Sequence, residues 1–406
     1  MNIEQIRQDF TILQRKHKGK RIVYLDNAAT SLKPKQVIEA ERFYYENIGA
    51  NVHRGLHILS EEASRVHESA HDTVAKFVGA KKNEVVFVRN ATEGMNLVMY
   101  SLLNSGFFKK GDKILVSKME HHSNIVPWQY LEKKIGIQLE FIGLDSNYEL
   151  DMRDFESKLK GTKLVSITGA SNTVATMPNI KEIEKAAHKE GALISVDGAQ
   201  LVPHKEVDFS GMNIDFLAFS GHKMLAPTGT GALVGKEKLL EKLEPFMFGG
   251  DMIHSVGLHD STWNVLPYKF EAGTPHIAGS FGIKAAVEYL KKVGMENIKK
   301  HEEKLTKLAI EEMQKIDSIK LYCPKNEKKQ GGIVLFESTK LSAHELAMAL
   351  SETENICIRS GMHCAEPLVS SLNKEGLARV SFYLYNTEEE VLFFTRSLKD
   401  VLDTLG

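Results

Sequence analysis

Short runs of β-branched and apolar residues alternate along residues 84–235 with segments in which apolar positions recur at helical spacing. Runs that are apolar throughout are typical of strands buried on both faces. Such runs predict seven strands, at Glu84–Val88, Lys113–Ser117, Leu139–Ile142, Lys163–Thr168, Ala192–Val196, Asp215–Phe219 and Ala232–Gly235. Between them, helical periodicity marks Glu93–Leu103 and Ile180–Glu190, the latter followed by Gly191 as a stop. The alternation predicts a mostly parallel seven-stranded sheet with helices on both faces.

A different order of elements follows the glycine- and proline-containing segment Glu271–Pro275. It predicts two successive helices, at Phe281–Val293 and 298–315, then strands at Gly332–Glu337, Ile356–Arg359 and Ala378–Phe382 and a last helix at Glu388–Leu402. This order is typical of a smaller α+β domain. We expect a large domain at 21–285, a small C-terminal domain at 286–406, and an N-terminal segment, 1–20, that packs on the small domain.

The composition is that of a globular protein, because 42% of the 406 residues are hydrophobic and 26% are charged. Lys and Arg number 52 and Asp and Glu 53, with no long basic run, which argues against nucleic acid as a partner. Met1–Arg7 lacks the apolar stretch of a secretory signal, and no apolar run reaches membrane-spanning length. We therefore expect a cytoplasmic protein with no membrane partner.

The three cysteines, Cys323, Cys357 and Cys364, are too few and too scattered for a disulfide framework. Their spacing matches no common zinc pattern and the histidines are dispersed, so we expect no metal site. Cys357 lies between two isoleucines, as a core residue would. Cys364 instead lies in a polar loop with Arg359 and His363, and neighbouring positive charge favours a thiolate, so this loop predicts a reactive cysteine.

The segment Ser220–Lys223 lies between a predicted strand and the turn-rich Ala226–Gly231. A lysine at the end of a buried strand is desolvated, which favours the neutral amine that can condense with a carbonyl. Asp197 also follows a predicted strand, and ligands of parallel sheets bind beyond the carboxyl ends of the strands. Pyridoxal phosphate requires a lysine that forms a Schiff base and an anion that keeps the pyridine nitrogen protonated. Lys223 and Asp197 together predict this cofactor.

Other residues have both a binding and an ordinary structural interpretation. Thr92 lies between a strand and a helix, where it could hold a phosphate or cap the helix, and Ser220 and His222 could supply further phosphate donors. His121 follows a strand and could stack on a planar ring or pack as an ordinary histidine. Arg379 could bind a carboxylate through its guanidinium fork or form a structural ion pair.

As a set, these motifs resemble the cysteine desulfurases of the SUF iron–sulfur assembly system, which belong to the class V aminotransferases of fold type I. The resemblance rests on Met119–Trp128, Val196–Gln200, Ser220–Lys223 with Pro227–Gly231, and Arg359–Leu368, and extends from Tyr24–Thr30 to Tyr385–Thr387. It implies an α/β, PLP-dependent transferase fold, with a large domain around a mostly parallel seven-stranded sheet and a smaller α+β C-terminal domain. It also implies a homodimer.

The resemblance further implies a role for each matching residue. Lys223 would be the Schiff-base lysine, Asp197 the pyridinium partner and Cys364 the sulfur acceptor, while Gln200 would hydrogen-bond the phenolic oxygen. His121 would stack on the cofactor ring and complete the catalytic set. The phosphate would be held by Thr92, Ser220, His222 and, from the second subunit, Thr274. The substrate would be contacted by His53, Asn172, Arg359 and Arg379.

The implied reaction converts L-cysteine to L-alanine and leaves the sulfur on Cys364 as a persulfide. The sulfur would pass to an acceptor protein and a scaffold complex for iron–sulfur cluster assembly. Selenocysteine lyase is a close alternative, because the same machinery cleaves C–Se bonds. A PLP-dependent transaminase or epimerase would not require the Cys364 loop. A non-catalytic scaffold would be expected to have lost Lys223, Asp197 or Cys364.

The chain departs from the family pattern at two places. Met362 replaces the first of two histidines that often precede the reactive cysteine, which changes the charge of the loop. The segment Asn172–Thr176 differs from the form of the bacterial members. The short loop between Arg359 and Pro367 resembles the group that needs an activating sulfur-acceptor protein.

Overall fold

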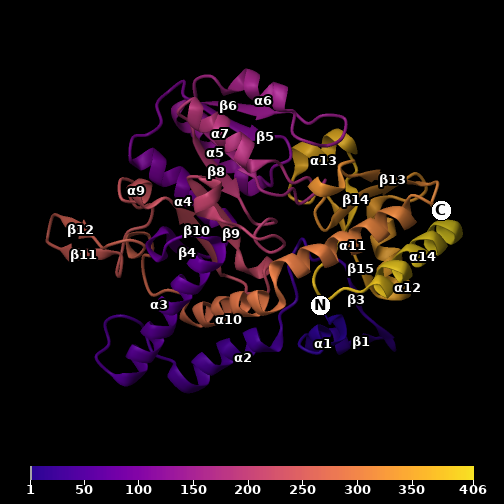
Figure 1. The fold of residues 1–406 in the computed structure, drawn as a ribbon, viewed down its shortest axis with the longest axis horizontal. Coiled ribbons are helices and arrows are strands. Elements are labelled where there is room, and N and C mark those ends of the chain that lie inside the picture. The colour runs from indigo at the N-terminus through magenta and orange to yellow at the C-terminus, as the bar shows by residue number, and fades with distance from the viewer. Residues whose placement is uncertain (1) are drawn as a thin grey trace.

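The computed structural model describes residues 2–406. Two sheets organise the chain, a seven-stranded sheet within residues 85–235 and a four-stranded sheet within residues 319–381. Figure 1 shows them side by side, with the large sheet and its helices on the left and the smaller sheet on the right. The N-terminal helix α1 (Ile3–Arg7) is joined to the C-terminal part by an ion pair of 2.8 Å between Arg7 Nη2 and Glu390 Oε1.

The large sheet is mostly parallel, as the sequence predicts. Its strands lie in the order β4 (Val85–Val88), β10 (Gly231–Gly235), β9 (Phe216–Ser220), β8 (Leu193–Asp197), β7 (Thr162–Thr168), β5 (Lys113–Ser117) and β6 (Gln138–Ile142). The five strands from β9 to β6 pair in parallel, whereas β10 runs antiparallel to both of its neighbours. The carboxyl ends of β5, β7, β8 and β9 therefore meet at one edge of the sheet.

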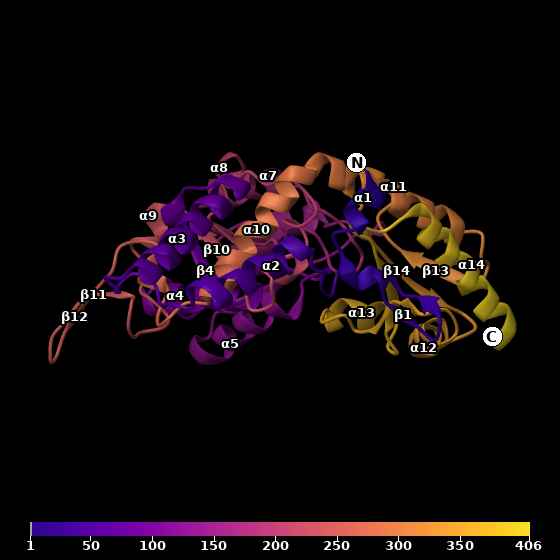
Figure 2. The ribbon, with the colours of Figure 1, turned by 90° about the horizontal axis from the view of Figure 1, so that it is seen from below.

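Helices bury both faces of this sheet, which explains why its strands are apolar throughout. Successive residues of β9 alternate between the two cores: Leu217 and Phe219 pack on one side, and Phe216 and Ala218 on the other. The first core is completed by α3 (Ile58–Val78), α7 (Ile180–Lys189) and α10 (Ile277–Val293). The second is completed by α4 (Ala91–Asn104) and α5 (Val126–Ile135). In Figure 2 the helices lie above and below the strands.

The smaller sheet is antiparallel and has a core of its own. Its order is β13 (Ile319–Tyr322), β14 (Ile333–Ser338), β17 (Leu377–Ser381) and β16 (Arg359–Gly361). Apolar residues of α11 (Met295–Met313), α12 (Ala343–Glu354) and α14 (Glu388–Leu405) pack against it. Ser342 and Thr387 begin α12 and α14 with capping boxes, which fix where both helices start.

Two predicted elements differ in the structure. The single strand predicted at Ile356–Arg359 is two strands, because the chain changes partner at Ile358. β15 (Ile356–Cys357) pairs in parallel with β3 (Val23–Tyr24), and β16 then pairs with β17 in the smaller sheet. Apolar character signals burial but not which neighbour a strand pairs with. The helix predicted from Phe281 begins at Ile277, because its first turn contains glycine and serine, which weaken the pattern.

The remaining elements are short or lie at the edges of the molecule. They are α2 (Lys35–Phe43), α6 (Met152–Leu159), α8 (Phe209–Met212), α9 (Glu237–Leu240), α13 (Glu366–Leu372), β1 (Lys16–His17), β2 (Lys20–Arg21) and the hairpin of β11 (Ile253–Val256) and β12 (Ser261–Trp263). Within residues 2–406, no helix is both long enough and apolar enough to cross a bilayer.

Candidate active site

A cavity of about 220 Å³ lies at the carboxyl ends of the large sheet's strands and is closed from the other side by residues of the smaller sheet. This is where parallel α/β sheets bind their ligands. The structure brings eleven of the predicted site residues to this one cavity: Thr92, His121, Asn172, Asp197, Gln200, Ser220, His222, Lys223, Arg359, Cys364 and Arg379.

Lys223 lies in a single 3₁₀ turn, Gly221–Lys223, directly after β9. The turn packs so closely that a Cβ on Gly221 would come within 2.2 Å of Thr230 Oγ1 and 2.9 Å of the Thr230 carbonyl oxygen. Lys223 is partly buried, and burial lowers the pKa of its amine from 10.5 to about 8 against the attraction of Asp197. The result is a lysine with an appreciable neutral fraction near neutral pH.

Asp197 is a fully buried carboxylate with few partners. It accepts the Ala199 N–H at 3.0 Å and the Ser123 hydroxyl at 3.3 Å. Among the described residues, no Lys, Arg or His nitrogen lies within 4.0 Å of it. Burial raises its pKa, and hydrogen bonding to Ala199 opposes that rise. A protonated heterocyclic nitrogen in the cavity would supply the missing donor.

His121 lines the cavity beside Asp197, and Ser123 links the two residues. The Ser123 N–H donates to His121 Nδ1 at 3.1 Å, so the neutral ring carries its proton on Nε2. Burial, followed by the charge of Lys223, lowers the pKa of His121 to about 3. The imidazole is therefore uncharged at neutral pH and free to stack on a flat ring or donate from Nε2.

The N-terminus of α4 forms another wall of the cavity. Thr92 belongs to the first turn of this 14-residue helix, where backbone N–H groups have no carbonyl partner within the helix. Ser220 Oγ accepts the Ala91 N–H at 2.9 Å, which leaves the serine hydroxyl hydrogen available. Burial, followed by the charge of Lys223, lowers the pKa of His222 to about 4. This wall therefore offers neutral donors and a helix dipole to an anion.

These groups fit pyridoxal phosphate. The α4 wall suits its phosphate, Lys223 its aldehyde and Asp197 its pyridine nitrogen. Gln200 donates to the Ala28 carbonyl oxygen at 2.8 Å, but its buried Oε1 has no partner within residues 2–406. A buried amide oxygen without a partner is costly, and a bound polar group in this cavity would relieve that cost.

On the opposite wall of the cavity, two arginines meet at one carboxylate. The sequence analysis predicted both arginines but not this carboxylate, Asp26. Asp26 Oδ1 lies 3.2 Å from Arg379 Nη2, and its Oδ2 lies 3.7 Å from Arg359 Nη1. Arg379 also donates to the Asn172 carbonyl oxygen at 2.8 Å, while its buried Nε has no partner in the part of the chain that the structure describes. The guanidinium is thus held in place while its Nε–H has no protein partner.

Asn172 is itself fixed rather than free. Its side-chain amide donates to the His363 carbonyl oxygen at 2.8 Å, which ties the loop after β7 to the loop that contains Cys364. Asn172 therefore positions both Arg379 and the cysteine loop.

The Cys364 loop is held in an unusual backbone conformation. His363 and Cys364 have φ angles of 49° and 55°, in the left-handed region that costs about 1–3 kcal/mol for each non-glycine residue. The His122 N–H donates to the Cys364 carbonyl oxygen at 2.7 Å, and His122 Nε2 accepts the Glu366 N–H at 3.0 Å. These contacts anchor both ends of the turn, and the Cys364 side chain stays exposed at the cavity mouth.

The electrostatic environment of this cysteine differs from the one predicted. His363 does not supply positive charge, because burial, followed by Arg379, lowers its pKa to about 3. Lys223 and Arg379 lie close enough to Cys364 for a thiolate to raise the pKa of each. Lys223 and Arg379 therefore contribute positive charge near the thiol.

Two predicted residues lie elsewhere in the same chain. Thr274 lines a separate, larger cavity of about 470 Å³ that contains none of the eleven residues above. His53 packs edge-on against Tyr268, with ring centroids 5.1 Å apart. Cys357 is only partly buried rather than a full core residue, because its strand β15 lies beside the partly exposed Tyr24.

The residues that sequence reasoning missed are Asp26, His122 and Ser123. Asp26 lies within Tyr24–Thr30, and the other two within Met119–Trp128, so all three belong to motifs that were already conspicuous. The sequence does not reveal their contacts, because the partners lie far apart along the chain. Asp26 is 353 positions from Arg379, and His122 is 244 positions from Glu366.

Comparison with known proteins identifies the family of this chain. The aminotransferase class-V family model matches residues 23–394. The cysteine desulfurase of Haloferax volcanii is 44% identical, with 96% of this chain and 95% of that protein aligned, and a probable cysteine desulfurase of Staphylococcus aureus is 44% identical over 98% and 96%.

Solved structures agree over the full length. The apo cysteine desulfurase of Thermococcus onnurineus superposes with a TM-score of 0.94 at 40% identity, covering 99% of this chain and 98% of its own. The Escherichia coli cysteine desulfurase CsdA superposes with a TM-score of 0.92 at 31% identity, covering all of both chains. These matches confirm the predicted PLP-dependent transferase fold. The chain belongs to the class-V aminotransferase family.

Proposed function

We propose that this protein is a PLP-dependent cysteine desulfurase that converts L-cysteine to L-alanine and takes the sulfur onto Cys364 as a persulfide. One observation carries the proposal: a lysine with a lowered pKa, a buried carboxylate with no ion-pair partner within 4.0 Å, and an exposed cysteine line the same cavity. The cysteine desulfurases among its relatives support it.

The chain's own groups divide the chemistry between them. Pyridoxal phosphate, when bound, supplies an electron sink that weakens bonds at the substrate carbons. Asp197 would hold the protonated ring nitrogen, and Thr92, Ser220 and His222 would hold the phosphate. Lys223 would bind the cofactor and then move a proton at the substrate carbon, which its pKa of about 8 suits.

Substrate binding and sulfur transfer would use the opposite wall. Arg379 would bind the L-cysteine carboxylate through the donor that has no protein partner, with Arg359 and Asn172 beside it. Cys364 would attack the substrate sulfur as a thiolate, so that the new S–S bond forms as the Cβ–S bond breaks. L-Cysteine and the protein thiol thus yield L-alanine and the protein persulfide, and a thiol reductant then releases sulfide.

The test measures alanine and sulfide released from L-cysteine by the purified, PLP-loaded protein with a dithiol reductant. Cys364→Ser should reduce both products at least about 100-fold while the visible absorbance of bound cofactor stays, because the nucleophile is lost but the cofactor site is not. Cys323→Ser is the matched control and should behave like the unmodified protein. Unchanged alanine release by Cys364→Ser would show that this thiol is not the sulfur acceptor.

The same assay separates the other candidate functions. L-Selenocysteine in place of L-cysteine tests selenocysteine lyase activity, since the site chemistry serves either chalcogen. Amino-group transfer to an added 2-oxo acid would indicate a transaminase, and racemisation of an added amino acid an epimerase. Absence of any turnover in a protein that binds PLP would favour a non-catalytic scaffold.

We further propose a SUF-type enzyme that acts as a homodimer, hands its sulfur to an acceptor protein and serves an iron–sulfur scaffold complex. In the dimer, Thr274 and His53 would reach the site of the second subunit, which would account for their absence from the cavity lining in their own chain. Mixed dimers of Lys223→Ala and Thr274→Ala chains should regain one complete site and about a quarter to a half of the activity. Mixed dimers without activity would contradict the shared site.

The division into parts also stays a proposal: 1–20, 21–285 and 286–406. Separate sheets with separate cores support it, although α10 runs unbroken past residue 285.

We propose a cytoplasmic location because all three cysteines are free, which is typical of a reducing compartment. Limited proteolysis and cell fractionation test these two points.

A further inference from the structure

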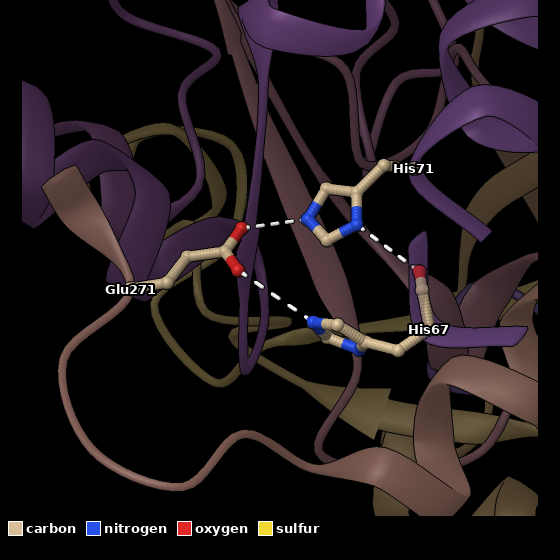
Figure 3. A group of neighbouring side chains, drawn as sticks. All are labelled: His67, His71 and Glu271. Atoms are coloured by element: carbon tan, nitrogen blue, oxygen red, sulfur yellow. Dashed lines mark hydrogen bonds and ion pairs between the residues drawn. The ribbon is translucent and has the colours of Figure 1, made fainter. Parts of the chain in front are cut away.

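Two histidines and a glutamate form a buried cluster away from the cavity that contains Lys223. His67 and His71 lie four positions apart on one face of α3, and Glu271 comes from the segment that precedes α10. Both imidazoles are fully buried, and the Glu271 side chain is 8% exposed. Their ligand atoms all lie within 4.8 Å of one another, and Figure 3 shows both rings turned toward the carboxylate.

In each ring, Nδ1, the nitrogen that points away from Glu271, donates a hydrogen bond. His71 Nδ1 lies 3.2 Å from the His67 carbonyl oxygen, which can only accept, so the proton of this ring is on Nδ1. His67 Nδ1 lies 2.8 Å from Ser280 Oγ, whose own hydrogen goes to the His276 carbonyl oxygen at 3.3 Å. Such bonds fix the tautomer of metal-ligating histidines and leave Nε2 as the ligand atom.

The two Nε2 atoms therefore present lone pairs to a carboxylate. His71 Nε2 lies 2.9 Å from Glu271 Oε1, and His67 Nε2 lies 4.0 Å from Glu271 Oε2. The Phe87 N–H donates to Oε1 at 2.7 Å. His67 Nε2 has no hydrogen-bond partner within residues 2–406. Buried acceptors that face one another are unfavourable unless a cation lies between them.

Neighbouring side chains hold the arrangement rigid. The His71 ring stacks on Phe87 with centroids 3.9 Å apart and an interplanar angle of 27°. The His67 ring meets His71 edge to face at 5.0 Å.

We propose that His67, His71 and Glu271 bind a divalent transition-metal ion of the Zn²⁺ class, with a water molecule as fourth ligand. Two imidazoles and one carboxylate are a common Zn²⁺ donor set. Tetrahedral Zn²⁺ holds its ligand atoms about 3.3 Å apart. The 4.0 Å separation of His67 Nε2 and Glu271 Oε2 therefore needs to close by less than 1 Å, and, since all the ligand atoms lie within 4.8 Å of one another, no pair needs to close by more than about 1.5 Å. The water would come from the adjoining cavity of about 470 Å³, which His67 and Glu271 line and which extends to the exposed Thr274.

The ion would fasten the segment that begins at Glu271 to helix α3. Thr274 lies three residues further along this segment, so metal occupancy would hold its position. The sequence indicates no such site, because Glu271 lies 200 residues from His71 and no cysteine accompanies the histidines.

The test measures zinc in the untagged, PLP-loaded protein after incubation with excess ZnSO₄ and gel filtration. We expect about one more Zn²⁺ per chain in the unmodified protein than in His67→Gln or Glu271→Gln. His204→Gln is the matched control, because His204 also pairs with a buried glutamate, at 2.9 Å from Glu302, but no second histidine joins it. This variant should retain the full zinc content.

Zinc K-edge X-ray absorption of the unmodified protein tests the proposal without any variant that could misfold. We expect two imidazole nitrogens and oxygen at about 2.0 Å. Sulfur ligands would place the ion on a cysteine and overturn the proposal, as would equal zinc content in His67→Gln and the unmodified protein. Failure to bind Zn²⁺ at all would also overturn it and leave a proton as the cation between His71 and Glu271. None of these readouts depends on desulfurase activity.

Discussion

The Lys223 amine gives the site a pH dependence that can be measured as the apo-protein captures its cofactor. Burial lowers the pKa of this amine from 10.5 to about 8. Only the neutral amine attacks the aldehyde of pyridoxal phosphate. At pH 7 about one-tenth of such amines are neutral, against about three in ten thousand at the ordinary pKa. Burial therefore raises the reactive fraction about 300-fold.

The rate of cofactor capture should rise about tenfold per pH unit below pH 8 and level off above it. Stopped-flow absorbance of the bound cofactor, after mixing apo-protein with PLP, measures this profile. Lys33 is a second, partly buried lysine whose pKa burial lowers to about 8. Lys33→Arg, which keeps a cation there, is therefore the control and should retain the inflection. A rate that still rises tenfold per unit between pH 8 and 10 would refute the reasoning, because the amine would then titrate like an exposed one.

Two further predictions concern groups that hold the site in shape. Gly221→Ala should destabilise the apo-protein to urea by about 1–3 kcal/mol, because the new Cβ would lie 2.2 Å from Thr230 Oγ1. Gly249→Ala, which meets nothing within 4 Å, should change stability by less than about 0.5 kcal/mol, and equal effects would contradict the packing argument. Asp26→Asn should raise the KM for L-cysteine about tenfold with a smaller change in kcat, because Arg379 loses the carboxylate that orients it. A KM that stays the same in steady-state assays would show that Asp26 does not position the arginine.

The order of the elements was predictable because local patterns encode it. A strand such as Phe216–Ser220 is apolar throughout since helices cover both its faces, and that burial is visible in the sequence. The change of sheet at Ile358 was not predictable, because strand residues lie on both sides of it and only tertiary contact decides which strands they pair with. Helix α3 (Ile58–Val78) also escaped prediction. Polar and charged side chains, His67 and His71 among them, interrupt its apolar stripe.

The sequence predicts the site residues that directly follow strands of the parallel sheet. It does not predict contacts between residues that are far apart in the sequence. Lys223 and Asp197 stand at the ends of adjacent strands, so the parallel sheet alone brings them together. The charge around Cys364 was misjudged, because His363 turns inward to the Leu377 carbonyl oxygen and is neutral there. The left-handed backbone at that turn has no sequence signal, since neither residue is a glycine.

The cavity that contains Lys223 should cost the apo-protein stability, and Lys223→Met tests this directly. A folded-state pKa of about 8 against 10.5 in the unfolded chain means that the unfolded chain binds protons more tightly. The cost is therefore fully present below pH 8, amounts to about 3 kcal/mol for a shift of this size, and disappears as the pH rises toward 10.5. Apo Lys223→Met should resist urea better than the unmodified apo-protein at pH 7, by up to this amount, and the difference should narrow at pH 9.5. If the methionine variant were the less stable one at pH 7, with a difference that does not change with pH, the amine would not be held in an unfavourable environment.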